Sequence, residues 1–466
     1  MDQQLLDRLL AGIPDYQAFL TVDEMDESSK RLAEAYPDKV EIFEAGKSRK
    51  GHPIYCLKIG SGPLNAFMFG CPHPNEPMGA MMLEYFSKKL AEDDELRESL
   101  GYTWYLIKSI DVDGTKLNEG WFKGPITLTN YTRHYFRPAG YEQAEWTFPM
   151  DHKNYHWHTP IPETQALMKI IDETKPAFMF SLHNAGFGGT YWYISKDMPE
   201  LWPKLYEASA RQNIPLHLGE PEVNFITPYA PAIFPFISLA DEYDQFEKFA
   251  SVPPETLLNC GESSDAYAKR YGTTALVCEL PYFYEARIMS QKEMPFTRRE
   301  AALKSLENNN RENDQIEERY LKVKSLISPD NPHAKMVEVC LKDREEHLKA
   351  ERGFIESNDK DYARPCKESE AFDNLELPKF FRLFLWTLLR RACGHELEKD
   401  HTPQEKALLT QVAQEAEERF NEKAAEAERD IHYEVTPIRR LIGVQLASGM
   451  IVADYVKNHR EEAGRA

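Results

Sequence analysis

The chain has 466 residues, 42% of them hydrophobic, and its formal net charge at pH 7 is −20. This length predicts one large domain with an appendage, and the apolar content is enough to build a buried core. The excess of acidic side chains argues against nucleic acid as a partner and against docking on anionic membranes, because clusters of lysine and arginine bind both.

The seven cysteines are scattered along the chain, and no two of them form a Cys-x-x-Cys pair. Their odd number and spacing indicate free thiols in a reducing compartment rather than a disulfide framework. The first residues lack the basic start and apolar run of a signal peptide, and no segment is apolar over a length that would span a bilayer. We therefore expect a cytoplasmic protein.

Short apolar runs alternate with amphipathic segments over the first 290 residues. The runs predict strands at 54–59, 66–69, 102–109, 177–182 and 275–280, and the spacing of apolar residues predicts helices at 77–91 and 163–172. This alternation indicates an α/β fold, with a mixed, centrally parallel, twisted sheet flanked by helices. In such sheets ligands bind just beyond the carboxyl ends of the strands.

The composition changes near residue 290, and after about residue 293 the chain is highly charged and almost wholly helical in pattern. Helices are predicted at 297–327, 333–352, 377–397, 402–432 and 437–459, and Thr402-Pro403 is a typical helix start. We expect two domains, an α/β domain over 1–292 and an all-helical domain over 293–466. The helical domain is expected to pack on the first or to pair subunits in a homo-oligomer.

Three segments end in histidine or glutamate, side chains of the types that commonly bind metals. His73 and Glu76 stand three positions apart after the strand at 66–69, His183 follows the strand at 177–182, and Glu279 lies near the end of the strand at 275–280. Zinc prefers nitrogen and oxygen ligands, and a catalytic site takes three from the protein. The alternatives are strand-end histidines without a metal, and a glutamate that pairs with a buried cation.

In this order the segments resemble the zinc carboxypeptidases of the carboxypeptidase A type (family M14), a clan that includes N-acyl amino acid deacylases such as succinylglutamate desuccinylase. Residues 46–54 resemble the family's early hairpin, and 110–114 resemble its Asn-Pro-Asp-Gly turn. Residues 160–167 resemble the start of the helix before the third metal ligand. The resemblance covers roughly residues 20–290.

The resemblance implies one zinc ion per chain, bound by His73, Glu76 and His183, with Glu279 as the general base. The metal would lower the pKa of its bound water and polarise the scissile carbonyl. In the family an arginine after the Asp-Gly turn stabilises the oxyanion. Arg133 is the better match to this arginine, and Arg137 is the second candidate.

The chain departs from the family where the substrate's terminal carboxylate is bound. Glu145 and Trp146 stand at the family's Asn-Arg pair, ahead of a retained Phe-Pro. A glutamate repels a carboxylate, so this alignment implies a substrate with a positive or neutral group near Glu145, or with a ring on Trp146. A slipped alignment would make Lys153 the carboxylate anchor. Gln143 falls at the position of the family's aspartate that orients the first zinc histidine.

Two further residues are expected to contact the substrate. Asn184 follows the third ligand directly, and Tyr229 is the preferred match to the family's capping tyrosine, with Tyr243 and Tyr267 as alternatives. The histidines at 152, 156 and 158 lie in a polar segment without nearby cysteine, which argues against a second metal.

The sequence therefore predicts a zinc metallohydrolase that cleaves an amide bond, as a carboxypeptidase acting on a peptide or modified amino acid. One alternative is an N-acyl amino acid deacylase of the same fold, because the carboxylate-binding pair is replaced. The other is a non-catalytic binding or scaffold protein that retains the fold. Metal content separates an enzyme from a scaffold.

Overall fold

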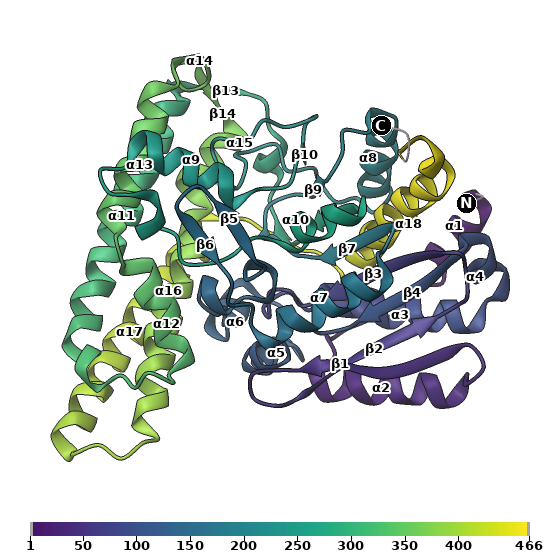
Figure 1. The fold of residues 1–466 in the computed structure, drawn as a ribbon. Helices are drawn as coiled ribbons and strands as arrows, with labels where there is room; N and C mark the ends of the chain where they lie inside the picture. The colour runs from purple at the N-terminus through teal and green to yellow at the C-terminus, as the bar shows by residue number, and fades with distance from the viewer. Residues whose placement is uncertain (1–2, 464–466) are drawn as a thin grey trace.

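The computed structural model describes residues 3–463, with side chains described up to residue 459. A central sheet of eight strands runs in the order β1-β2-β4-β3-β7-β11-β9-β10 (Figure 1). The strands are β1 (Val40–Lys47), β2 (Pro53–Ile59), β3 (Leu64–Gly70), β4 (Tyr102–Ile107), β7 (Phe178–Leu182), β9 (Tyr191–Ile194), β10 (Ile233–Phe234) and β11 (Thr274–Glu279). The five predicted strands are thus all present, with ends shifted by one or two residues.

The middle of the sheet is parallel, as predicted. Strand β3 pairs in parallel with both β4 and β7, and β7 pairs in parallel with β11. Antiparallel pairs flank this core, β1 with β2 and β2 with β4 on one side and β11 with β9 on the other. Because β3, β7 and β11 are neighbours that run the same way, their carboxyl ends meet at one edge of the sheet.

Alternating side chains of the central strands build two hydrophobic cores, one on each face of the sheet. Ala66 and Met68 pack into the larger core, while Phe67 and Phe69 pack into the smaller one. This two-residue period is what a buried strand requires. Helix α3 (Met78–Glu92) contributes to the larger core and α7 (Pro162–Thr174) to the smaller one, in agreement with the helices predicted at 77–91 and 163–172.

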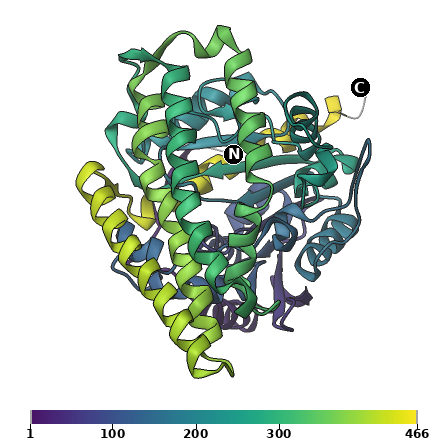
Figure 2. The same ribbon diagram turned by 90° about the vertical axis from the view of Figure 1, so that its left-hand side faces the viewer.

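The helical region stands beside the sheet as a group of long helices (Figures 1 and 2). The predicted helix at 333–352 is two helices, broken at Lys342 and Asp343, where Asp343 has a φ of 49°. The helices of ten or more residues in this region are α11 (Arg298–Val323), α12 (Pro332–Leu341), α13 (Arg344–Ser357), α16 (Pro378–Leu397), α17 (Pro403–Asp430) and α18 (Ile438–Ala463).

The last helix, α18, leaves this group and packs on the sheet against β7, β11, α3 and α8 (Trp202–Arg211). Gly449 lets α18 lie close to β7, because a Cβ there would be 2.8 Å from the ring of Phe180. The described chain therefore returns to the α/β part at its end, and the predicted boundary at 292/293 stays a prediction. Residues 464–466 of the predicted helical domain lie outside the described residues.

The remaining elements are shorter or lie at the edges of the molecule. Helix α2 begins with a capping box in which Thr21 and Glu24 exchange hydrogen bonds. Among the residues that the structure describes, no helix is both long and apolar enough to cross a membrane. These elements are α1 (Gln3–Ala11), α2 (Val22–Ala35), α4 (Asp94–Leu100), α5 (Val112–Asn118), α6 (Leu128–Arg133), β5 (Met150–His152), β6 (Tyr155–Trp157), β8 (Gly186–Phe187), α9 (Leu239–Phe249), α10 (Ser264–Ala268), β12 (Pro281–Tyr284), β13 (Glu293–Thr297), α14 (Asp359–Tyr362), β14 (Pro365–Lys367), α15 (Glu368–Ala371) and β15 (Glu434–Val435).

Candidate metal centre and pocket

The carboxyl ends of β3, β7 and β11 bring the predicted metal ligands together. His73 and Glu76 lie in the loop between β3 and α3, and His183 follows β7 directly. All three are buried, and one ligand atom from each lies within 4.8 Å of the others. At the first residue of this loop, Cys71 has a φ of 50°, a left-handed conformation that is strained for a residue with a side chain.

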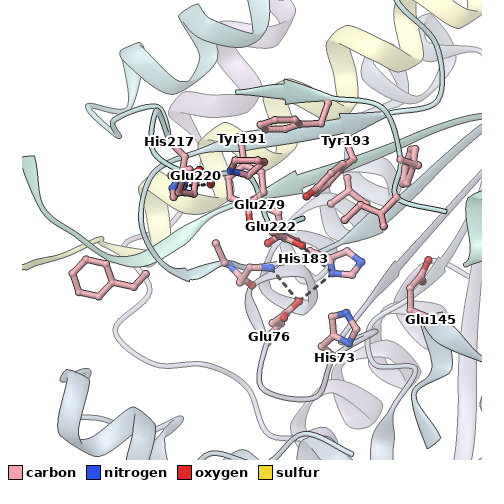
Figure 3. Close-up of a pocket in the computed structure, with 18 of the residues that line it drawn as sticks. His73, Glu76, Glu145, His183, Tyr191, Tyr193, His217, Glu220, Glu222 and Glu279 are labelled. Carbon is pink, nitrogen blue, oxygen red and sulfur yellow. Dashed lines mark hydrogen bonds and ion pairs between the residues drawn. The ribbon is translucent and has the colours of Figure 1, made fainter. Parts of the chain in front are cut away.

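The ligand atoms face one another in the pocket (Figure 3). His183 Nδ1 lies 3.3 Å from Glu76 Oε2 and 3.7 Å from Glu279 Oε1. The same Glu76 oxygen accepts the backbone N–H of Asn184 at 3.1 Å. Two imidazoles and one carboxylate at this spacing are a donor set that suits zinc.

The burial and charge around His73 suit a metal ligand. Burial lowers its pKa well below the ordinary value, and the charges of Arg137 and His183 lower it further. A metal ligand must be neutral imidazole, so this shift favours the binding form. His73 Nδ1 is buried and has no hydrogen-bond partner among the side and main chains that the structure describes. An orphaned buried nitrogen beside two other donors fits an ion at this position.

Glu279 ends β11 and points at the same group. Its Oε2 is buried without a hydrogen-bond partner in the described part of the chain. Burial raises its pKa well above the ordinary value, and the charges of Glu76 and Glu222 raise it further. A carboxylate with a free oxygen next to a metal-ligand set has the position of a general base.

The structure separates the two candidate arginines. Arg137 lines the pocket, with Nη1 3.6 Å from Glu76 Oε1. Arg133 ends α6 and points the other way, where it bonds Glu417 and donates to Asn421 Oδ1 at 2.7 Å, both on α17. Our preference for Arg133 as the oxyanion group therefore does not fit the structure, because its guanidinium is held by the helical region.

The predicted substrate residues divide in the same way. Glu145, Trp146 and Asn184 line the pocket. Tyr229 does not fit its predicted role, because it is 37% exposed and stacks on Trp202 outside the pocket lining. Lys153 does not fit the role of anchor in the slipped alignment either, because it pairs with two carboxylates of α9.

Asn184 and Glu145 use their polar atoms within the protein. The Asn184 amide accepts a hydrogen bond from Tyr282 and donates to the Leu280 carbonyl. Burial raises the pKa of the Glu145 carboxyl, and His183 together with hydrogen bonds from Ser264 opposes this shift.

The metal centre opens into a cavity of about 520 Å³. Two aromatic residues that the sequence analysis missed, Tyr191 and Tyr193, project into it from β9, and the Tyr191 hydroxyl donates to Glu222 (Figure 3). Their signal in the sequence was the two-residue spacing of Tyr191 and Tyr193, which places both on one face of a strand.

The helical region forms part of the cavity wall, which the sequence did not reveal. Asp373, Leu377 and Phe381 line the cavity together with His217 and with the segment 220–222. Asp373 Oδ2 accepts the backbone N–H of Glu220 at 2.6 Å and lies 2.9 Å from His217 Nε2. The segment that carries Glu222 is therefore attached to the helical region.

Arg49 joins the early hairpin to the rest of the α/β part. Its backbone N–H and guanidinium bond the buried Glu163 at the start of α7, and the guanidinium also lies 3.3 Å from Glu142 and 3.8 Å from Asp111. Burial raises the pKa of Asp111 to about 7. The segments that carry the resemblance, far apart in sequence, thus converge on one cation.

The polar hairpin of β5 and β6 also brings possible ligands together. Asp151 Oδ1 lies 2.6 Å from His156 Nδ1 and 3.0 Å from His158 Nε2, and all three side chains are exposed. These contacts are hydrogen-bonded pairs on the surface. The cavity lining does not include them.

Comparison with known proteins identifies the family. The zinc carboxypeptidase family model (peptidase family M14) matches residues 25–285, more than half of the chain. The chain belongs to the zinc carboxypeptidase family. This confirms the predicted resemblance, and the central parallel sheet with its flanking helices confirms the predicted fold class.

Solved structures give weaker matches to this zinc carboxypeptidase-family chain. A carboxypeptidase A from Helicoverpa armigera is 17% identical, with 60% of this chain and 70% of that chain covered and a TM-score of 0.38. A metallo-carboxypeptidase from Burkholderia cenocepacia is 14% identical, with 56% of this chain and 60% of that chain covered and a TM-score of 0.33. The family match and the local geometry carry the argument about function.

Proposed function

We propose that the protein is a zinc-dependent hydrolase that cleaves an amide bond, acting as a carboxypeptidase on a peptide or a modified amino acid. One observation carries this proposal. The buried carboxylate of Glu279, with one oxygen free, faces the ligand set of His73, Glu76 and His183 at the floor of a cavity. A scaffold protein needs neither the ligands nor the base.

The two imidazoles and the carboxylate would hold one zinc ion per chain. When bound, zinc would supply Lewis-acid polarisation of the amide carbonyl and activation of a water molecule. Glu279 would take the proton from the attacking water at Oε2 and deliver it to the leaving amine. Arg137, with its guanidinium on the cavity side of Glu76, would donate to the oxygen on which negative charge develops.

The charges that line the cavity indicate which charge a substrate can carry. Among its described lining residues Arg137 is the sole arginine, and lysine is absent from the lining. Carboxylates are frequent there, and the ion pair described for Arg137 is with Glu76 rather than with Glu222. In the predicted alignment Glu145 and Trp146 stand at the family's anchoring position, so a free terminal carboxylate would meet a single guanidinium, that of Arg137, against several negative charges.

This imbalance favours a second candidate, the N-acyl amino acid deacylase or a hydrolase of blocked peptides. Both act on an amide bond through the same groups. They differ in whether the substrate presents a free carboxylate beyond the scissile bond.

A matched pair of peptides tests the proposal. One has a free C-terminal carboxylate and the other a C-terminal amide, with the same sequence, and an N-acyl amino acid is added as a third substrate. The zinc-loaded protein should release an amine from at least one of them, with the amide favoured over the acid, and Glu279→Gln should abolish the release. Zinc-loaded protein that cleaves none of a broad panel would favour the scaffold alternative.

We also propose a reducing compartment such as the cytoplasm. All seven cysteines are free thiols in the structure, and five of them are buried. Quantifying thiols in freshly purified protein would check this, since seven reactive thiols after denaturation are expected.

A further inference from the structure

In the predicted alignment Glu145 falls at the family's carboxylate-binding position, yet both of its oxygens face protein donors. Oε1 accepts the backbone N–H of Ser264 at 3.1 Å and the Ser264 hydroxyl at 2.5 Å. Oε2 accepts the hydroxyl of Ser181 at 3.2 Å. The side chain is 4% exposed, so these bonds are formed away from bulk water.

The Ser181 hydroxyl links this carboxylate to a metal ligand. Ser181 and His183 lie two residues apart at the end of β7, so their side chains point to the same face of the sheet. Ser181 Oγ lies 2.9 Å from His183 Nε2. The other ring nitrogen, Nδ1, faces Glu76 and Glu279.

The direction of each hydrogen bond follows from the donors present. Ser264 donates to one Glu145 oxygen through an N–H that cannot reverse. The hydrogen bonds from Ser264 and Ser181 favour the ionised form of Glu145, and an ionised carboxylate can only accept. Ser181 must therefore give its hydrogen to Glu145, which leaves its lone pair to accept a hydrogen from His183 Nε2. The imidazole then carries its proton on Nε2 and presents the Nδ1 lone pair to the metal position.

We propose that Glu145 is a positioning residue for the metal centre, which acts through Ser181 to hold His183 in the tautomer and orientation that binds zinc. The inference rests on the proposed role of His183 as a ligand. It also explains the departure at this position, since the glutamate here serves the metal rather than the substrate. Outer partners of this kind typically contribute ten- to a hundredfold to metal affinity.

We call the chain of hydrogen bonds from Glu145 through Ser181 to His183 the relay. The variant Glu145→Gln tests it by reversing the direction of these bonds. Ser264 N–H still needs an acceptor, so the glutamine must turn its carbonyl oxygen toward Ser264 and its amide group toward Ser181. Ser181 then has only His183 Nε2 to donate to, which places the imidazole proton on Nδ1, the metal side. We expect zinc affinity, measured by competition with a chromophoric chelator, to fall by about ten- to a hundredfold.

The double variant Ser181→Ala/Glu145→Gln provides the decisive comparison. Without the serine hydrogen nothing forces the proton onto Nδ1, so the double variant should bind zinc more tightly than Glu145→Gln alone and about as tightly as Ser181→Ala. A merely structural role for Glu145 would give losses that add. The visible spectrum of the cobalt-substituted protein should change in Glu145→Gln and return toward that of Ser181→Ala in the double variant.

Glu163→Gln is the matched control, because Glu163 is a fully buried glutamate that bonds Arg49 outside the cavity lining. It should leave zinc affinity unchanged within about twofold, as expected for a site without contact to the ligands. The role of Glu145 would be contradicted if the losses of zinc affinity in the two single variants add in the double variant, or if Glu145→Gln binds zinc as tightly as wild type. Loss of zinc in His183→Ala would show in the same experiment that the metal site itself is correctly assigned. Wild type that binds no zinc would overturn both the relay and the proposed function. If Glu145→Gln does not fold, Ser181→Ala must lower zinc affinity by itself for the inference to stand.

Discussion

Asp373 accepts the backbone N–H of Glu220 at 2.6 Å, and through this bond the helical region holds a wall of the cavity. The Glu220 side chain is fixed from the same side, since Arg298 Nε donates to it at 2.9 Å and Asn374 Nδ2 does so at 2.9 Å. Three residues from beyond residue 292 thus position a segment of the zinc carboxypeptidase-like part. The helical region contributes to the site and is more than an attached bundle.

Loss of the hydrogen bond between Asp373 and Glu220 should make residues 217–222 more mobile without changing zinc binding. In Asp373→Ala a partly buried N–H loses a charged acceptor, at a cost of about 1–3 kcal/mol. We expect faster amide hydrogen exchange across residues 217–222 and a KM raised several-fold, with zinc affinity unchanged. Asp373→Asn keeps an oxygen for Glu220 N–H and should restore most of the protection. Equal exchange in Asp373→Ala and wild type would contradict the anchoring role.

Glu279→Gln should separate metal binding from catalysis. The amide keeps the size of the side chain but cannot take a proton, so kcat/KM should fall by about 10²–10⁴. Zinc content should match that of wild type, because Glu279 is outside the ligand set of three. Atomic absorption together with steady-state rates measures both. Retained activity in this variant would remove Glu279 from the role of base.

The two arginines should behave differently on truncation. Arg137→Ala removes the guanidinium that lines the cavity, and kcat/KM should drop by about 10²–10³ with zinc retained. Arg133→Ala breaks its contacts with α17 and should lower the free energy of unfolding by about 1 kcal/mol or less, with activity within about twofold of wild type. The reverse pattern would restore Arg133 as the oxyanion group.

Glu242 makes stability depend on pH. It lines a second cavity, of about 350 Å³, and burial raises its pKa to about 7, with the charge of Glu262 adding to the shift. Because the folded pKa lies above the unfolded one, the stability linked to the protonated form is fully present below about pH 4.5 and is lost as the pH rises through 7.

The variant Glu242→Gln removes this titration. Its free energy of unfolding relative to wild type should rise by on the order of 2 kcal/mol between pH 5 and pH 8.5. Urea denaturation at the two pH values measures the difference. Glu247→Gln, on the same helix but exposed and paired with Lys153, is the control and should show no such gain on going to pH 8.5. A Glu242→Gln difference that is flat with pH would contradict the raised pKa.

The sequence predicted the parts of the site that lie at strand ends. His73, His183 and Glu279 each follow or end an apolar run, and the geometry of a parallel sheet is enough to bring such positions together. The apolar runs also predicted the five central strands, whereas the two cores that these strands build became visible only in the structure. The predicted features depend on local pattern and on one general property of α/β sheets.

Other parts depend on contacts between distant segments, which periodicity does not encode. Arg133 and Arg137 are four residues apart, and only the position of α17 shows which one is held away from the cavity. Tyr229 was preferred as a capping residue, although its ring packs on Trp202. Asp373 lies about 150 residues beyond the segment that it holds, so its role becomes visible only in the folded chain.

The zinc content of purified protein tests the central claim most directly. Wild type, His73→Ala, His183→Ala and the surface control His156→Ala would be loaded with zinc, freed of excess metal by gel filtration and analysed by atomic absorption. The account predicts one zinc per chain in wild type and in His156→Ala, and loss of zinc in the other two with the fold retained. Wild type without zinc, or zinc that remains in both His73→Ala and His183→Ala, would contradict it.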